Sequence, residues 1–143
     1  MKLNYDCMRE CLLYLESAEN VRISSFEGEL DISLEPIFIE QLFADIKNWT
    51  DQDIFYALFN LEQGGYIDAS AGYSNNACNN FCVNYMILRG HEFLNAVRDD
   101  GRWKGIKRGL GTVRDYSLSA INAIAEGMTA GAISAYLSRQ TTN

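Results

Sequence analysis

The chain has 143 residues, 48% of them hydrophobic, and a formal net charge of -7 at pH 7. This length is enough for one folded body with its own core and a short appendage. A single proline excludes a proline-rich low-complexity protein, and four cysteines without a secretory pattern argue against a disulfide-rich secreted scaffold. Because the sequence begins with no signal-peptide pattern, we expect a cytoplasmic protein with reduced thiols.

The net charge is the sum of two opposed halves. Residues 1–88 carry four bases against fourteen acids, whereas residues 89–143 carry eight bases against five acids. Six of the eight bases fall within seventeen residues, namely Arg98, Arg102, Lys104, Lys107, Arg108 and Arg114. The positive charge is therefore a local cluster and not a general bias.

The first part of the chain predicts a helix followed by a hairpin. Apolar residues recur at intervals of three and four from about Leu3 to Ala18, which is the spacing of one buried helical face. Apolar and polar residues then alternate over Val21 to Phe26 and over Leu30 to Leu34, as in two strands. The turn between them, Glu27-Gly28-Glu29, is acidic.

Two further helices are predicted next. Pro36 fits the first turn of a helix, where its missing N–H costs nothing, and this helix should run to about Trp49. Thr50 is the predicted N-cap of a third helix. Gly64 and Gly65 would end that helix by allowing a left-handed turn.

A second hairpin closes the predicted body. Tyr66 to Tyr73 and Phe81 to Leu88 have strand character, Gly90 would form the turn after them, and a closing helix should begin at about His91. This order predicts an α+β, mostly helical protein with a winged-helix-like domain over residues 1–100, whose wing is the second hairpin. Residues 101–143 would form a basic linker and a C-terminal helix.

Three segments carry a family resemblance. The start MKLNYDCMRECLLYLE, the EQGGYI turn and the LRGHEFLNAVRDDGRWKGIK segment resemble the domain-of-unknown-function family 2513, small proteins of bacteria and often of their prophages. The most specific part is an ordered run of Gly90, His91, Glu92, Phe93, Leu94, Arg98, Asp99, Asp100 and Trp103. The resemblance implies a phage or mobile-element origin and a winged-helix-like body. The sequence departs from the family pattern over residues 27–35 and 75–84.

The same run contains residue types that catalysis uses, but their spacing is unsuitable. His91 and Glu92 are consecutive, and consecutive helical positions point about 100° apart, so they cannot pair as a base and its orienting acid. Asp99 and Asp100 are also consecutive, so the same geometry excludes them as a catalytic pair. We therefore expect this segment to be architectural, with no catalytic residue, no cofactor and no enzyme activity.

The cysteines raise the question of a metal site. Cys7 and Cys11, with Cys78 and Cys82, would form a four-thiolate zinc set if the two pairs met in space. The two-residue gap of zinc knuckles is absent, and Cys7 and Cys11 lie on the apolar stripe, where free cysteine behaves as a small hydrophobe. We expect core thiols and no metal.

The distribution of charge leads to two hypotheses about what the protein binds. The predicted reading helix, residues 50–63, contains Asp51, Asp53 and Glu62 and no base, so the phosphates of duplex DNA would repel it. We expect the acidic half to bind another protein. If the protein comes from a phage, this partner would be a host factor such as a defence nuclease. The alternative is a transcriptional regulator that binds DNA through the basic cluster of residues 98–114, with contacts from Arg102, Lys104, Lys107 and Arg108.

The last segment, Ser117 to Leu137, is rich in small residues. Ala123, Gly127 and Gly131 recur every four positions, with Met128 beside them, and such a stripe lets another helix approach closely. Packing within the chain and pairing between two subunits are equally favoured, and in the second case these four residues would form the dimer contact. A membrane span is less favoured, because polar residues dilute the apolar character.

Overall fold

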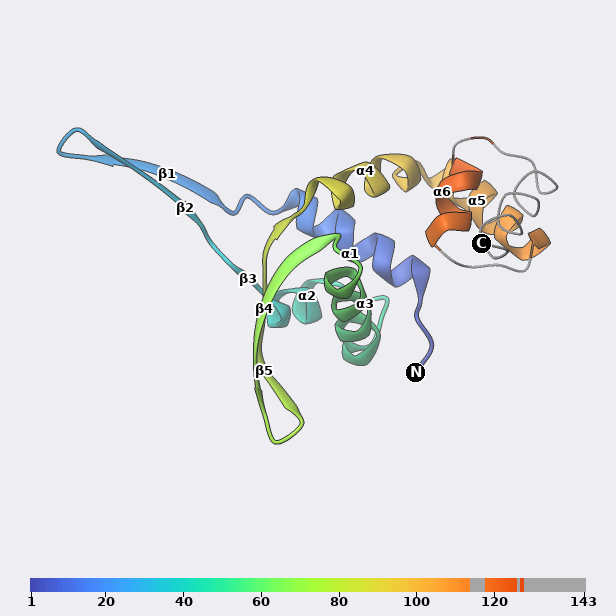
Figure 1. The fold of residues 1–143 in the computed structure, drawn as a ribbon, viewed down its shortest axis with the longest axis horizontal. Coiled ribbons are helices and arrows are strands. Elements are labelled where there is room, and N and C mark those ends of the chain that lie inside the picture. Colours follow the sequence, from blue (N-terminus) through green and yellow to red (C-terminus); the bar gives the residue numbers. More distant parts are fainter. Residues whose placement is uncertain (114–117, 126, 128–143) are drawn as a thin grey trace, which may run out of the picture. The chain divides into compact units, whose positions relative to one another are not determined.

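The computed structural model describes residues 1–113, 118–125 and 127. Within them lie six helices and two small antiparallel sheets, which confirms the α+β class (Figure 1). The elements in order are α1 (Tyr5–Ser17), β1 (Val21–Phe26), β2 (Glu29–Leu34), β3 (Ile37–Phe38), α2 (Ile39–Asp45), α3 (Asp51–Gln63), β4 (Ile67–Ser74), β5 (Ala77–Met86), α4 (Leu88–Val97), α5 (Asp100–Val113) and α6 (Leu118–Ala125).

The chain forms two compact units, and the boundary falls inside α4. Unit 1 is Met1–His91 and unit 2 is Glu92–Asn143. The core of unit 1 is built where α1 packs against α3. Cys11, Leu12, Leu58 and Leu61 are fully buried there, which agrees with the helical spacing in the sequence.

Helix caps explain where α1 and α3 begin. The side chain of Asn4 accepts a hydrogen bond from the Cys7 N–H at 3.0 Å, and Thr50 Oγ1 accepts one from the Asp53 N–H at 3.1 Å. Each bond satisfies a main-chain donor that the first helical turn leaves free. The predicted N-cap at Thr50 is confirmed, and so is the left-handed exit at Gly65, whose φ is 79°.

The second helix is shorter than predicted, and Pro36 lies outside it. Ile37 and Phe38 instead form β3, which pairs with Val83 and Cys82 of β5, and α2 begins only at Ile39. A two-residue strand leaves no local alternation, so pairing with a distant strand decides its conformation. The helix ends at Asp45 and not near Trp49.

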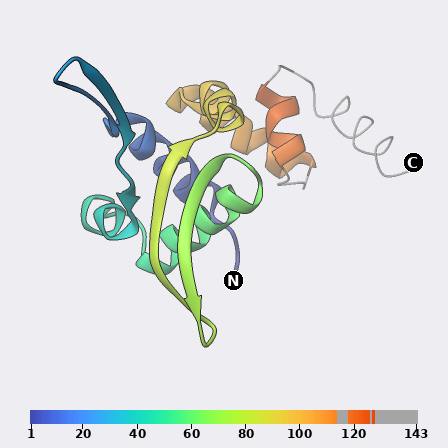
Figure 2. The ribbon, with the colours of Figure 1, turned by 60° about the vertical axis from the view of Figure 1, so that its left-hand side comes forward.

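The second predicted hairpin is confirmed as β4 and β5, which form a sheet with β3 in the order β3-β5-β4 (Figure 2). Asn75 and Asn76 form its two-residue turn, both with positive φ, and asparagine tolerates that conformation. Ile67, Phe81 and Val83 are buried on the sheet. This hairpin therefore belongs to the core of unit 1.

Gly90 was predicted in a turn and lies instead in the first turn of α4. A Cβ there would lie 2.2 Å from the main-chain oxygen of Tyr66 and 2.7 Å from Cγ of Met86. No side chain fits at such a distance. Close packing against Tyr66, far away in sequence, is therefore the reason for the glycine.

Unit 2 is helical where a linker was expected. Helix α5 spans most of the basic cluster and buries Trp103, Ile106 and Leu110. Helix α6 ends at Ala125, and the N–H of Gly127 donates to the Ile124 carbonyl at 2.9 Å with φ at 88°. A left-handed glycine just past a helix is a common C-terminal cap, so the prediction of one continuous helix through Gly127 is wrong.

Candidate interaction surfaces

The predicted acidic residues lie at two ends of one helix. Asp51 and Asp53 are in the first turn of α3, where carboxylates are favoured by the helix dipole. Asp53 also accepts a hydrogen bond from the Thr50 hydroxyl at 3.0 Å. Glu62 lies in the last turn and accepts one from the Gln63 amide at 2.7 Å. The three carboxylates therefore line the length of α3 and do not form one cluster.

The far end of α3 adjoins the second hairpin. An open pocket of about 390 Å³ lies there, lined by Glu62 and Gln63 of α3 and by residues of β4 and β5 that include Tyr73 and Phe81. In β4, the carboxylate of Asp68 accepts a hydrogen bond from the Asn84 side-chain amide at 2.9 Å. We call the surface of α3, β4 and β5 the acidic face, because residues 48–88 contain four acids and no base.

The predicted basic residues are on α5, in unit 2. Lys104, Lys107 and Arg108 are exposed and are spaced by three and four positions, so they are neighbours on one side of the helix. We call these three residues the basic face. The ammonium of Lys107 lies 5.8 Å from the centre of the Trp103 ring. Arg102 instead donates a hydrogen bond to the carbonyl of Ala125, which ties α5 to the end of α6.

The segment suspected of catalysis is built into helices. His91 and Glu92 lie on α4 and are both exposed. Asp99 precedes α5, and its carboxylate accepts a hydrogen bond from the Arg102 N–H at 2.7 Å, which is the role of an N-cap. Arg98 donates to Asn95 at 2.8 Å. The first of these bonds gives Asp99 a structural use.

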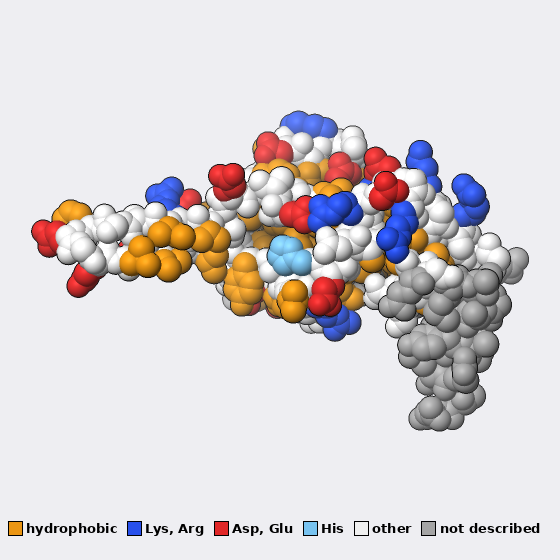
Figure 3. Space-filling model, turned by 90° about the horizontal axis from the view of Figure 1, so that it is seen from above, with side chains coloured by type: hydrophobic (Ala, Val, Ile, Leu, Met, Phe, Trp, Pro, Cys, Tyr) orange, Lys and Arg blue, Asp and Glu red, His pale blue; other side chains and the backbone are white. Residues whose placement is uncertain are grey.

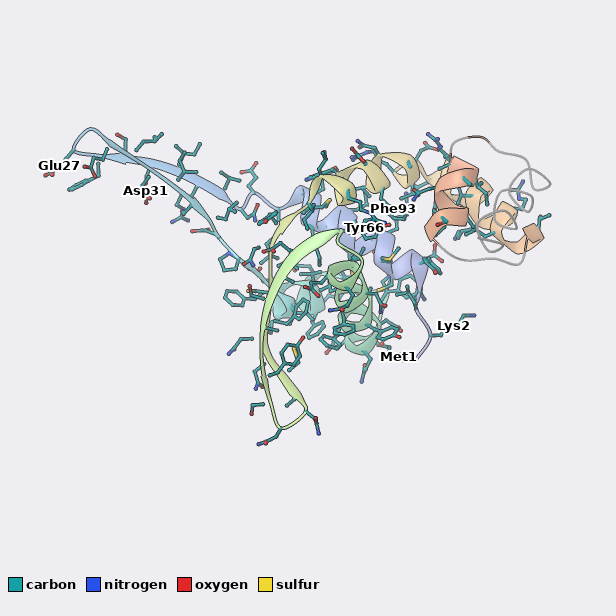
Figure 4. The ribbon with its side chains drawn as sticks, in the orientation of Figure 1. Met1, Lys2, Glu27, Asp31, Tyr66 and Phe93 are labelled. Atoms are coloured by element: carbon teal, nitrogen blue, oxygen red, sulfur yellow. The ribbon has the colours of Figure 1, made fainter. Side chains whose placement is uncertain are left out.

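Tyr66 brings two of the segments that carry the family resemblance into contact. Tyr66, labelled in Figure 4, is 2% exposed. The guanidinium of Arg89 lies 4.8 Å from the centre of the Tyr66 ring. The Arg89 guanidinium also lies within 3.4 Å of the Tyr66 hydroxyl, and the Tyr66 carbonyl accepts from the Ile87 N–H. The GGYI turn and the LRG segment therefore meet at one packed junction in unit 1.

The thiols are mostly buried. Cys7 and Cys11 are 0% exposed, and a hydrogen bond with Cys7 together with burial raises the pKa of Cys11 far above its ordinary value. A thiol with a raised pKa is a poor nucleophile and a poor metal ligand at neutral pH. Within residues 1–113, 118–125 and 127, no group of three or more His, Cys, Asp and Glu side chains is placed to hold a metal ion.

The predicted dimer stripe is described only in part. Ala123 is 4% exposed within unit 2, and Gly127 lies in the turn that ends α6. Met128 and Gly131 lie outside the described residues, as does most of the segment 117–137. None of the helices that the structure describes is both long enough and apolar enough to cross a membrane.

The most exposed apolar surface of unit 1 is one that the sequence reasoning did not single out. Strands β1 and β2 form an arm, Val21–Leu34 (Figure 1). Every residue of the arm is exposed, and Figure 3 shows hydrophobic side chains along it. Cross-strand pairs place five aliphatic side chains on one side of the arm, with exposed fractions between 48% and 67%: Val21, Ile23, Leu30, Ile32 and Leu34. We call these five the arm face. The alternation of apolar and polar residues in the two strands is the sequence pattern that indicates this face.

The base of the arm is fixed to the rest of unit 1. The Glu35 N–H donates to the Asn20 carbonyl at 2.7 Å, and the Asn20 amide donates to the Asn84 carbonyl of β5 at 2.7 Å. Arg22 and Glu35 form an ion pair at 2.8 Å. The arm is therefore an anchored extension of the unit.

The fold is that of a small α+β protein, and a comparison of sequences assigns it to a family. The family described as hypothetical protein (DUF2513) matches residues 2–114, so the chain belongs to this family. Neither a curated protein nor a solved structure matches the chain.

Proposed function

We propose that the protein acts by binding another protein, without chemistry of its own, and that the acidic face of unit 1 is the contact surface. One observation carries the proposal: residues 48–88, which form α3, β4 and β5, hold four acids and no base. A surface of one charge sign attracts a partner of the opposite sign and speeds their association. The partner would therefore present a basic surface.

The topology of unit 1 supports a winged-helix-like body for this role. Helices α1, α2 and α3 precede a hairpin, and the short β3 between α1 and α2 pairs with the hairpin's last strand. In such a body α3 would be the reading helix and the β4–β5 hairpin the wing. Here both elements are acidic, and each close pair of like charges costs on the order of 1 kcal/mol, which disfavours DNA as the ligand.

A basic groove that normally holds a nucleic acid is the kind of partner surface that this face fits. Carboxylates such as Asp51, Glu62 and Asp68 would occupy positions where phosphates otherwise lie. In the phage setting that the family resemblance implies, a host defence protein is one such partner.

The test is affinity capture from a bacterial lysate with matched variants. Asp51→Asn with Glu62→Gln removes two charges from the acidic face, while Glu19→Gln with Glu40→Gln removes two exposed charges elsewhere in unit 1. A protein identified by mass spectrometry should be lost with the first pair and retained with the second. Equal retention by both variants would reject the acidic face as the contact surface.

A second candidate function rests on the basic face of α5. Lys104, Lys107 and Arg108 would contact DNA phosphates in a transcriptional regulator. A gel shift with duplex DNA at physiological salt decides between the two candidates. Binding at micromolar protein that weakens steeply as salt rises, and that Lys104→Gln with Lys107→Gln abolishes, would favour the regulator. We expect no appreciable binding.

A further inference from the structure

The arm presents an apolar surface that the described part of unit 1 does not cover. Its five aliphatic side chains are half to two-thirds exposed, although aliphatic side chains of this size are usually buried. Together they form a patch of about 500 Å², comparable to the largest apolar patch on an ordinary monomer, and such patches are often functional. The opposite side of the arm is mainly polar and carries Arg22, Ser24, Asp31, Ser33 and Glu29, with Phe26 at the end.

A hairpin of this kind gains stability from a partner on its apolar side. A two-stranded hairpin is marginal in water, and it needs further strands or a packing partner over its apolar side. The bonds of Asn20 and Glu35 anchor the base of the arm but cover none of the arm face. A partner that covers this face would therefore stabilise the arm.

We propose that a second copy of the chain covers it, with the two arm faces packed against each other in a symmetric dimer. The area supports this occupant, because two such faces would bury up to about 1,000 Å² in total, which is about the smallest area of a specific interface. An apolar face can pair with its own copy, because a two-fold axis brings each patch against an identical patch.

Charge selects the direction in which the two arms cross. Glu27 and Asp31 lie toward the end of the arm (Figure 4), and Glu29 follows the turn there. If the arms pointed the same way, these acids would meet and repel one another. Antiparallel arms separate them and set each acidic end toward the base of the other arm. The Ile23–Ile32 pair, at the middle of the arm, then lies at the two-fold axis.

Matched charge pairs test the dimer without weakening the hairpin. Ile23→Lys with Ile32→Glu puts opposite charges at positions that are cross-strand partners, so attraction between the strands is kept while the arm face loses its centre. The control is Ser24→Lys with Ser33→Glu. It adds the same two charges to the opposite side, where they face Asp31 and Arg22.

The measurement is light scattering across a concentration series with the full chain. The wild type and the control should have twice the 16.1 kDa monomer mass at tens of micromolar. The first pair should raise the dissociation constant by more than about 100-fold, as expected when central interface residues are lost. Circular dichroism should show the same helix content in all three proteins, because the arm is outside the core.

Two results would overturn the proposal. One is a wild type that stays monomeric at 100 µM. If hydrogen exchange then finds the arm amides protected at every concentration, a segment of the same chain covers the face. The other is a dimer that the Ile23 and Ile32 changes leave intact, which would place the contact elsewhere. Neither result bears on the acidic face, whose test uses a different partner and different residues.

Discussion

Unit 1 contains two hairpins of similar construction, and only one of them is packed. Both have alternating apolar residues and a two-residue turn in which both central residues have positive φ. In the β4–β5 hairpin, β3 extends the sheet and α3 packs on it, so Ile67 and Val83 are buried. In the arm, the equivalent apolar side chains remain exposed. The difference shows that alternation creates an apolar face, whereas the rest of the fold decides whether that face is core or surface.

The largest contrast should come from the same substitution in each hairpin. Ile67 is 1% exposed and Ile23 is 65% exposed. Ile67→Ala should lower the free energy of unfolding by about 2–5 kcal/mol, because it leaves a cavity in a packed site. Ile23→Ala should cost under about 1 kcal/mol. Urea unfolding, at a concentration where light scattering gives a monomer, measures both. Similar losses would mean that the arm is part of a covered core.

The packed hairpin is also held by a close main-chain approach that the arm lacks. Gly90→Ala would push a Cβ to within 2.2 Å of the Tyr66 carbonyl, just before β4, and should cost about 1–3 kcal/mol or more. Gly105→Ala is the matched control, since a Cβ there meets nothing within 4 Å in α5. It should gain about 0.5–1 kcal/mol from helix propensity. Thermal unfolding would show opposite shifts, and a loss in both variants would contradict this account of Gly90.

Local patterns in the sequence predicted the elements that are locally determined. The α1 stripe, the Thr50 cap, the turn at Gly65 and both hairpins depend on neighbours within a few residues. The features that were missed depend on distant contacts. Gly90 looks like a turn residue until the Tyr66 carbonyl is placed beside it.

Helix α5 was missed for a different reason. Its residues were predicted to be a basic linker, and its several glycines lower the local helix propensity, because glycine weakens a helix by up to about 1 kcal/mol. The buried residues Trp103, Ile106 and Leu110, spaced by three and four positions, were the signal for the helix. For the candidate surfaces, the sequence predicted their charge and placed Asp51, Asp53 and Glu62 on one helix, but it could not predict that the arm face is uncovered.

The two turns give a smaller contrast. The arm uses Glu27, with φ at 51°, followed by Gly28, whereas the other hairpin uses Asn75 and Asn76. Glutamate tolerates left-handed backbone less well than asparagine does, so Glu27→Asn should stabilise the arm by about 1 kcal/mol. Hydrogen exchange of the β1 and β2 amides measures this local gain, which should slow exchange several-fold. Asn75→Glu is the reverse change and should speed exchange in β4 and β5. Unchanged exchange in both would show that the turns do not limit hairpin stability.

The smallest contrast concerns two polar links, one in the packed body and one at the arm. Tyr14 donates from its hydroxyl to Asp45 at 2.6 Å and so joins α1 to the end of α2. Burial, and then this hydrogen bond, raises the pKa of Tyr14 from 10.0 to about 12. Tyr14→Phe should cost about 0.5 kcal/mol, the low end for a hydrogen bond, because the side chain is half-exposed.

The pH dependence of this link distinguishes it from the arm's ion pair. A pKa raised in the folded state means that folding favours the protonated phenol, so its contribution is full below pH 10 and is lost as the pH rises through about 12. The stability difference between wild type and Tyr14→Phe should therefore shrink over that window.

Glu35→Gln, which removes the exposed Arg22–Glu35 pair, should change stability by under about 1 kcal/mol with no trend over the same window. Urea unfolding of the three proteins at pH 8, 10 and 11.5 measures both differences. A Tyr14→Phe difference that stays constant to pH 11.5 would show that the hydroxyl gains no stabilisation from Asp45, and that packing of the ring alone joins the two helices.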